Sequence, residues 1–234
     1  MSEMTTLTTI DDPKFLKQYM RFCRKITMSM ELSVEDGRLW TKFLDSTHVT
    51  MTEFAIPVQG PDFKPILLDT DKIEPVIRSL KGMVGFCVEN EYLVIESEGK
   101  RQKIRYTEVE EPTRQPDPKI ENMVEFGIDQ KELTCILADV QAIDSNYVGF
   151  ALKGSKLVYS AKSDTGEIRA WKMIDGYSVE ETTGHFSIEW MKLLKILKGQ
   201  NPIVKFATDR PMCLTYGKPS EPGLKFWIAP RVES

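Results

Sequence analysis

The sequence predicts an α+β protein built from two similar halves, each with two helices packed on antiparallel sheets. Three observations support this fold class. The order helix, strands, helix, strands occurs twice in the 234 residues, the landmarks of the two copies keep a constant displacement, and an acidic, proline-containing segment separates them. A repeat of this kind dictates the architecture, so it is considered before any single motif.

The first copy begins with a helical pattern. Residues 12–26 place apolar side chains at helical spacing, and strand-like runs follow on both sides of a turn at Glu35–Asp36–Gly37. A second helical pattern covers residues 71–82 and stops at Gly82, which suits the end of a helix. Further strand-like runs complete the first half.

The second copy repeats these landmarks. Residues 130–143 and 187–199 have helical patterns, and a turn is expected at Lys153–Gly154–Ser155. Gly154 lies 117 positions after Gly37, and Gly199 lies 117 positions after Gly82. Because residue identity between the halves is low, coincidence of common turn glycines is the alternative. The shared spacing favours duplication.

The segment between the copies reads as a linker. Residues 107–120 contain three prolines and four acids and almost no large apolar side chain, which disfavours both a helix and a central strand. The predicted organisation is therefore a domain over residues 1–106, a connecting linker over 107–120 and a second domain over 121–234.

Composition limits the functions that the chain can have. It carries 31 basic and 35 acidic residues, a formal net charge of −4, so nucleic-acid contact requires cations gathered on one surface. Apolar runs are far shorter than the roughly 20 residues of a membrane span, and the first 12 residues carry no readable secretory signal. The four cysteines form no Cys-x-x-Cys pair, which favours buried thiols in a reducing cytosol over disulfides or zinc.

Three of the four predicted helices oppose their apolar stripe with cations. On the helix at 12–26 the outer face is free of acids, whereas solvated helix backs ordinarily mix both signs. The helix at 71–82 gives a weaker signal because Glu74 shares its outer face. Such stripes in an acidic protein suit contact with phosphates by charge alone. The cations are Lys14, Lys17, Arg21, Arg24, Lys25, Arg78, Lys81, Lys192, Lys195 and Lys198.

The helix at 130–143 breaks this pattern. Its predicted core stripe is Leu133, Ile136, Leu137 and Val140, and only Lys131 supplies positive charge on the other side.

An enzyme is the main competing class, and the sequence argues against it. Nucleotide-binding, zinc-protease and serine-hydrolase motifs are absent, and His48 and His185 are the only histidines. Adjacent acids such as Glu110–Glu111 and Glu180–Glu181 point in different directions on a loop or strand. We therefore expect no catalytic residue, no metal and no cofactor.

Three segments resemble a known family, the PCNA sliding clamps of archaeal and eukaryotic replication. They are LDSTHVTMTEFAI at 44–56, the acidic linker after Tyr106 and the closing KFWIAPRVE at 225–233. Their order and spacing agree with the duplicated architecture, and the resemblance covers nearly the full length. The Glu-Glu-Pro linker and Ala-Pro-Arg ending look more archaeal than eukaryotic.

The resemblance implies a ring of three subunits that encircles duplex DNA, with helices lining the hole and sheets outside. Edge strands near 100–107 and 167–173 would join neighbouring subunits. Both edges carry cations, which leaves open a ring whose neighbour is a related chain. The implied interface residues are Lys100, Arg101, Lys103, Arg105, Glu167, Arg169 and Trp171.

The resemblance also implies partners. The helix cations would keep duplex DNA centred without reading its sequence, and a polymerase, a flap nuclease, a ligase and a clamp loader would be clients. Their short peptides would enter an apolar pocket, for which ordinary core is the competing interpretation of Leu44 and Val49. The implied pocket residues are Leu44, His48, Val49, Met51, Pro211, Trp227, Ala229, Pro230 and Val232.

Two alternatives remain beside a replication clamp: a clamp-like subunit of a heterotrimeric or damage-signalling ring and, more remotely, a small cytosolic enzyme. The expected location is the cytoplasm with the nucleoid if the chain is archaeal, and the nucleus if it is eukaryotic.

Overall fold

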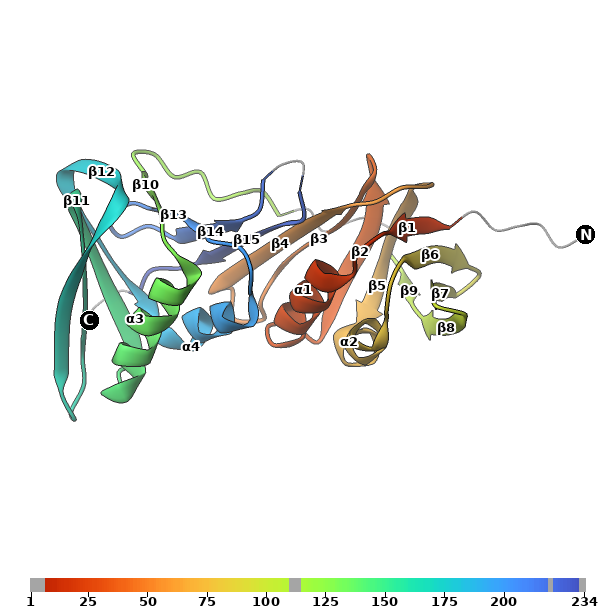
Figure 1. Ribbon diagram of the computed structural model, residues 1–234, viewed down its shortest axis with the longest axis horizontal. Coiled ribbons are helices and arrows are strands. Elements are labelled where there is room, and N and C mark those ends of the chain that lie inside the picture. The colour runs from red at the N-terminus through yellow and green to blue at the C-terminus, as the bar shows by residue number, and fades with distance from the viewer. Residues whose placement is uncertain (1–6, 110–114, 219–220, 232–234) are drawn as a thin grey trace, which may run out of the picture. The chain divides into compact units, whose positions relative to one another are not determined.

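The computed structural model describes residues 7–109, 115–218 and 221–231, and within them two compact units (Figure 1). The first unit comprises Met1–Ser46, Thr52–Gln115 and Lys218–Leu224, and the second comprises Thr47–Met51, Pro116–Gly217 and Lys225–Ser234. Each unit combines antiparallel strands with two helical segments, so the predicted α+β class is confirmed.

The first unit contains two sheets. A four-stranded sheet has the order β1-β6-β7-β8, and the strands β4-β3-β2-β5-β9 follow one another in the other sheet. A hairpin with its turn at Asp36 and Gly37 connects β2 and β3, and β6, β7 and β8 also pair in succession. The strands are β1 (Thr8–Ile10), β2 (Ser29–Glu35), β3 (Arg38–Leu44), β4 (Thr50–Pro57), β5 (Phe63–Asp69), β6 (Val84–Glu89), β7 (Tyr92–Ser97), β8 (Lys100–Arg105) and β9 (Thr107–Glu108).

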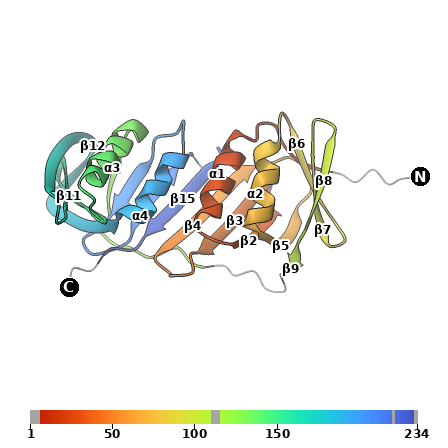
Figure 2. The same ribbon diagram turned by 90° about the horizontal axis from the view of Figure 1, so that it is seen from below.

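Two helices, α1 (Lys14–Arg24) and α2 (Thr70–Ser79), lie side by side against the strands of the first unit (Figure 2). The predicted apolar stripe of α1 is buried, with Leu16, Tyr19 and Phe22 fully inside. The Tyr19 ring lies 5.6 Å from that of Phe54 on β4, which anchors the helix to the sheet. The opposite face of α1 is therefore left to solvent.

The second unit has one continuous set of strands in the order β11-β12-β10-β13-β14-β15. Phe126, Phe186 and Phe206 form edge-to-face ring pairs in its core, with centroids 6.2 and 6.3 Å apart. The strands are β10 (Val124–Gly127), β11 (Tyr147–Lys162), β12 (Glu167–Ser187), β13 (Ile203–Phe206), β14 (Met212–Tyr216) and β15 (Gly223–Ile228).

The turn expected at residues 153–155 does not reverse the chain. Gly154 instead forms a bulge within the 16-residue strand β11, where it lies opposite Ser178 of β12. Gly37 and Gly154 share the left-handed backbone, with φ of 69° and 59°. Whether such a glycine forms a hairpin turn or a bulge depends on the neighbouring strand. At Gly154, β12 pairs with β11 on both sides of the glycine, so the chain stays extended past the bulge.

Helix α3 (Gln130–Ala142) buries the predicted stripe of Leu133, Ile136, Leu137 and Val140. The final helical pattern is not one long α-helix. It is a single turn, α4 (Ile188–Met191), followed by a 3₁₀ helix, η1 (Lys192–Ile196).

Side-chain spacing explains this 3₁₀ segment. Ile188, Met191, Leu194 and Leu197 are buried at intervals of three, the period of a 3₁₀ helix. A period of 3.6 residues would also place Trp190 and Leu193 on the core side, but both are only half-buried. The same period brings Lys192, Lys195 and Lys198 into one row.

All four cysteines are free thiols. Cys23, Cys87 and Cys213 are buried as expected, whereas Cys135 on α3 is exposed, which corrects the expectation of four buried thiols.

Candidate nucleic-acid and partner-binding surfaces

The outer face of α1 presents uncommitted cations. Lys14, Arg21 and Lys25 are exposed, and none of the three forms an ion pair with any residue that the structure describes. Lys17 is half-buried, and its Nζ donates to the carbonyl oxygen of Leu80 beyond the end of α2. The helix therefore offers three solvated charges and one charge that holds a neighbouring segment.

Arg24 has a different environment from the other cations of α1. Its Nε lies 2.7 Å from an Asp71 carboxylate oxygen, and its Nη1 lies 2.9 Å from one of Glu74. The Glu74 side chain is only 4% exposed, and Arg78 approaches it at 3.9 Å. Arg24 thus ties α1 to α2 and compensates a buried carboxylate, so a phosphate would have to compete with two existing partners.

The cations of the second unit are partly engaged. Lys192 is exposed, while the half-buried Lys195 donates to the Gln141 side-chain oxygen on α3 at 2.6 Å. Lys198, just after η1, is exposed and also has an interaction partner. On α3, Cys135, Ala138 and Ala142 are exposed beside Lys131, so this helix offers little charge to an anion.

The residues implied for peptide docking fall mainly in the second unit. Val49 and Ala229 are joined by a backbone hydrogen bond of 2.8 Å, and Pro230 pairs with Phe186 as an isolated bridge. His48 is exposed with a left-handed φ of 58°, so its side chain projects from a tight bend. These contacts bring the segment around His48 and the segment after Trp227 together.

Several of these residues are less accessible than a pocket wall requires. Trp227 is 5% exposed and Met51 is 4% exposed, so these two implied pocket residues offer little surface to a peptide. Trp227 is a residue of β15, and the Lys225 ammonium of the same strand lies 5.7 Å from the centre of its ring. Pro211 and Leu44 are half-buried, and Val232 lies outside the described residues.

Part of the linker is held by the second unit. Asp117 lies 3.5 Å from the Lys225 ammonium on β15, while residues 110–114 lie outside the described part of the chain. The first two residues of the linker, Thr107 and Glu108, form β9 against β5.

The two segments implied for subunit contacts each leave one side unpaired among the described residues. Strand β8 is the last strand of the four-stranded sheet, and residues 167–173 of β12 pair with β11 alone among the described residues. Exposed Arg169 and Trp171 lie on this second edge, and Lys156 stacks 4.8 Å from the Trp171 ring. Unpaired edges of this kind can accept a strand from another chain.

The cations of β8 are balanced within their own sheet. Glu89 pairs with Arg101 and with Lys103 at 3.1 Å, and Arg105 pairs with Glu91 at 2.8 Å. The Lys103 hydrogen bond and the nearby positive charges lower the pKa of Glu89, which keeps the carboxylate ionised. The edge is consequently less basic than its sequence suggests.

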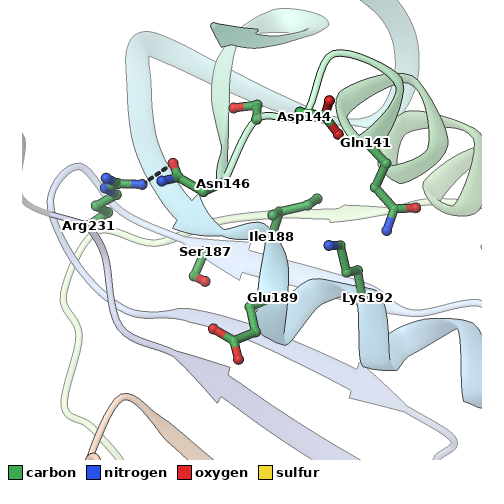
Figure 3. Close-up of a pocket in the computed structure, with 9 residues that line it drawn as sticks. Gln141, Asp144, Asn146, Ser187, Ile188, Glu189, Lys192 and Arg231 are labelled. Carbon is green, nitrogen blue, oxygen red and sulfur yellow. Dashed lines mark hydrogen bonds between the residues drawn. The ribbon is translucent and has the colours of Figure 1, made fainter. Parts of the chain in front are cut away.

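Sequence reasoning missed a polar pocket of about 810 Å³ in the second unit, between the end of α3, the start of α4 and Arg231 (Figure 3). The sequence indicates Lys192 only as a cation of a helix and Arg231 only as a residue of the closing segment 225–233. The pocket combines residues distant in sequence, so no local motif could have revealed it.

Within the described residues, no helix is long and apolar enough to cross a membrane, and no cluster of acids, cysteines and histidines has the geometry of a metal site.

Comparison with solved structures identifies the fold. PCNA from Thermococcus kodakaraensis superposes with a TM-score of 0.86 at 15% identity, covering 97% of this chain and 100% of that one. PCNA from A. fulgidus, solved with the C-terminal region of FEN-1, gives a TM-score of 0.86 at 19% identity, covering 97% of this chain and 99% of that one. A PCNA2–PCNA3 complex from Sulfolobus tokodaii gives 0.81 at 15% identity over 98% and 100%.

No model of a known protein family matches the sequence, and no curated protein matches it either. The matches to solved structures nevertheless show that the chain has the fold of the PCNA sliding clamps over nearly its whole length. The sequence identities of these matches are below 20%.

Proposed function

We propose that this protein is a sliding clamp, a ring-shaped processivity factor that encircles duplex DNA and tethers replication and repair enzymes. The observation that carries the proposal is the clamp fold over 97% of the chain combined with the acid-free outer face of α1. A fold alone does not define a function, but exposed cations without a described ion pair, such as Lys14, Arg21 and Lys25, are what a sliding contact requires.

A closed ring needs little affinity for DNA, because topology holds it in place. Salt-sensitive contacts from Lys14, Arg21 and Lys25 to phosphates would keep the duplex centred and would carry no sequence information. We assign the remaining predicted cations, Lys17, Arg24, Arg78, Lys81, Lys192, Lys195 and Lys198, to supporting positions, since several of them already have protein partners.

Ring closure would use the two open edges. Strand β8 of one subunit would pair with residues 167–173 of the next, and the intrasheet pairs of Glu89 would reduce repulsion from the basic side chains of β8. This arrangement retains the division into domains 1–106 and 121–234 with the connecting linker 107–120. A light-scattering mass three times 26.8 kDa would support closure by one kind of chain.

A mixed ring is the second candidate. It is favoured by Arg169 on one edge and Lys100 on the other, both exposed and without an ion pair among the described residues. A purified chain that stays monomeric or dimeric and reaches the trimer mass only with a related chain would replace the first candidate with this one.

Client enzymes would dock through short peptides on the surface around His48, Ala229 and Pro230. The proposal is supported by the backbone hydrogen bond between Ala229 and Val49, which joins the segment after β15 to the segment around His48. We propose no catalytic activity of the chain itself; its effect on a polymerase, a flap nuclease or a ligase would come from tethering.

The DNA contact is tested by replacing Lys14, Arg21 and Lys25 together with alanine. Duplex binding should weaken roughly tenfold at moderate salt, because about three counterion-releasing contacts are lost. Binding is measured by retention on duplex DNA with blocked ends across a salt series. The matched control replaces the exposed Lys64, Lys119 and Lys218, and the equivalent triple in the second unit replaces Lys192, Lys195 and Lys198.

We expect the control to bind like the wild type and the second-unit triple to lose less than the α1 triple. Equal losses in the α1 triple and the control would remove α1 from the DNA contact. Loss of the circular dichroism signal would identify an unfolded variant and call for the single substitution Arg21→Ala.

A further inference from the structure

The polar pocket of the second unit holds two cations that no described carboxylate neutralises. Figure 3 shows Arg231 on one side and Lys192 on the other, with Ser187 between them. Neither cation has an acidic partner within 4.0 Å among the described residues. The Ser187 hydroxyl makes no hydrogen bond in the described part of the chain, so it is a further unused donor.

Arg231 is held in position before any ligand arrives. Its backbone N–H donates to the His185 carbonyl at 2.7 Å, its guanidinium donates to the Asn146 side-chain oxygen, and the same group lies 5.4 Å from the centre of the Tyr147 ring. One donor of the fork is thereby used and the others remain available. A guanidinium already ordered in this way loses little entropy on binding an oxyanion.

The pocket also contains the acids Asp144 and Glu189. Both are exposed, and neither side chain makes a hydrogen bond or an ion pair with a described residue. They are therefore solvated charges that a ligand would have to order, unlike Arg231. Their presence opposes a chain of successive phosphates, which would bring several negative charges past them, but it tolerates a single carboxylate.

The pocket adjoins the surface proposed for client peptides. Arg231 directly follows Pro230, whose pairing with Phe186 fixes the end of that surface, and Ser187 directly follows Phe186. A peptide seated beside Ala229 and Pro230 would need only a few extended residues, at about 3.3 Å each, to reach the pocket.

We infer that this pocket is an accessory specificity site that receives an acidic side chain flanking the docking segment of a client peptide. Arg231 would bind the carboxylate through two donors, Ser187 would add a hydroxyl, and Lys192 would contribute positive charge from the opposite wall. The inference rests on the proposed clamp function and adds to it the chemistry of the preferred client.

The test uses peptides of the C-terminal region of FEN-1, the segment that was solved with A. fulgidus PCNA. Each fluorescent peptide is extended at one end by Gly-Glu-Glu or by the neutral Gly-Gln-Gln, and a third set carries Gly-Lys-Lys. Fluorescence anisotropy measures binding to the full-length wild type, to Arg231→Gln and to Arg231→Glu. Arg210→Ala is the matched control, because Arg210 is an exposed arginine of the same unit at a different depression.

We expect the peptide that carries the acidic extension, at one of its two ends, to bind about fivefold more tightly at low salt than the peptide with the neutral extension. This preference should fade in 0.5 M NaCl. Arg231→Gln should remove the preference while leaving affinity for the neutral peptide unchanged. Arg231→Glu should reverse it in favour of lysine, and Arg210→Ala should preserve it.

Equal binding of acidic and neutral peptides by the wild type would overturn this inference and leave the clamp proposal standing. Failure of every peptide to bind would instead count against peptide docking itself. A wild-type preference for the lysine extension would identify Asp144 and Glu189 as the recognising groups and would also overturn the inference. So would weaker duplex-DNA binding by Arg231→Gln without any change in peptide preference, which would make the pocket a phosphate site.

Discussion

The helices of the two units use positive charge differently. In the first unit Arg24 joins α1 to α2 by ion pairs, whereas Lys14, Arg21 and Lys25 are exposed and form no ion pair with a described residue. In the second unit Lys195 is bound to the neutral Gln141, Lys192 lines a pocket, and α3 contributes almost no charge. Helices at corresponding places in a duplicated fold therefore need not do equivalent work.

The two units should differ most in the stability that each loses when the cation joining its two helices is replaced. In the first unit this cation is Arg24, between α1 and α2. Arg24→Met leaves the carboxylate of Glu74 buried, with only Arg78 at 3.9 Å, so we expect a larger fall in the free energy of unfolding than for any other variant of these helices. The loss is smaller than for a fully buried pair because the Arg24 side chain is 38% exposed. Urea denaturation followed by circular dichroism measures the change.

Lys195→Met is the counterpart in the second unit and should cost at most about 1 kcal/mol, because Gln141 is neutral and can bond to water instead. Adding Glu74→Gln to Arg24→Met should restore part of the lost stability. An equal cost for Arg24→Met and Lys195→Met would contradict the contrast.

A smaller difference is expected at the helix N-caps. Asp69 accepts hydrogen bonds from the backbone N–H groups of Asp71 and Lys72 at 2.9 and 3.3 Å, whereas Asp129 accepts one from Lys131 at 2.7 Å. Asp69→Ala and Asp129→Ala should each cost roughly 1 kcal/mol, with the larger loss at Asp69. Urea denaturation at neutral pH compares the two variants.

The cap of α2 also has a predictable pH dependence. Burial alone would raise the pKa of Asp69, but hydrogen bonds from the Lys72 side chain and the Asp71 backbone outweigh it and lower the pKa. Stability from the ionised cap is thus present above the unfolded-state pKa and is lost as the pH falls through the folded-state value. Asp69→Asn keeps an acceptor and should flatten this dependence, and an unchanged acid limb would refute the assignment.

The smallest effect concerns thiol chemistry and leaves stability untouched. Complete burial raises the pKa of Cys23, and burial also raises the pKa of Cys213 to about 11, so both remain protonated and shielded at pH 8. Cys135 is exposed on α3. Iodoacetamide should therefore modify Cys135 first, as read by peptide mass spectrometry, and Cys135→Ser should abolish the rapid phase. Labelling of Cys23 at a comparable rate would show that the first unit opens readily.

Local sequence patterns predicted the helices that obey one period throughout. The stripe of α3 is buried as its spacing indicated, because its apolar residues fit 3.6 residues per turn. The segment from Ile188 to Leu197 departed from prediction although its signal was visible: both its apolar residues and its lysines recur every third position. A period of three residues therefore describes the burial of this segment better than a period of 3.6.

Local sequence patterns did not predict the features that depend on residues distant in the sequence. Gly37 and Gly154 adopt the same left-handed backbone, yet only the neighbouring strand decides whether a hairpin or a bulge results. In the same way, the residues next to Arg24 in the sequence do not indicate its ion pairs with Asp71 and Glu74. The residues next to Trp227 do not indicate that its side chain is buried. Local pattern specifies elements, whereas tertiary pairing specifies which charges and rings stay accessible.

The units exchange short pieces of chain, and this has a consequence for how the protein is made. Residues 218–224 belong to the first unit although they are translated after nearly all of the second, and Pro222 accepts a hydrogen bond from the Tyr19 hydroxyl while Glu221 accepts one from Arg38. The first unit therefore lacks its last segment until residues 116–217 of the second unit have been translated. Completion of the first unit thus depends on synthesis of most of the second.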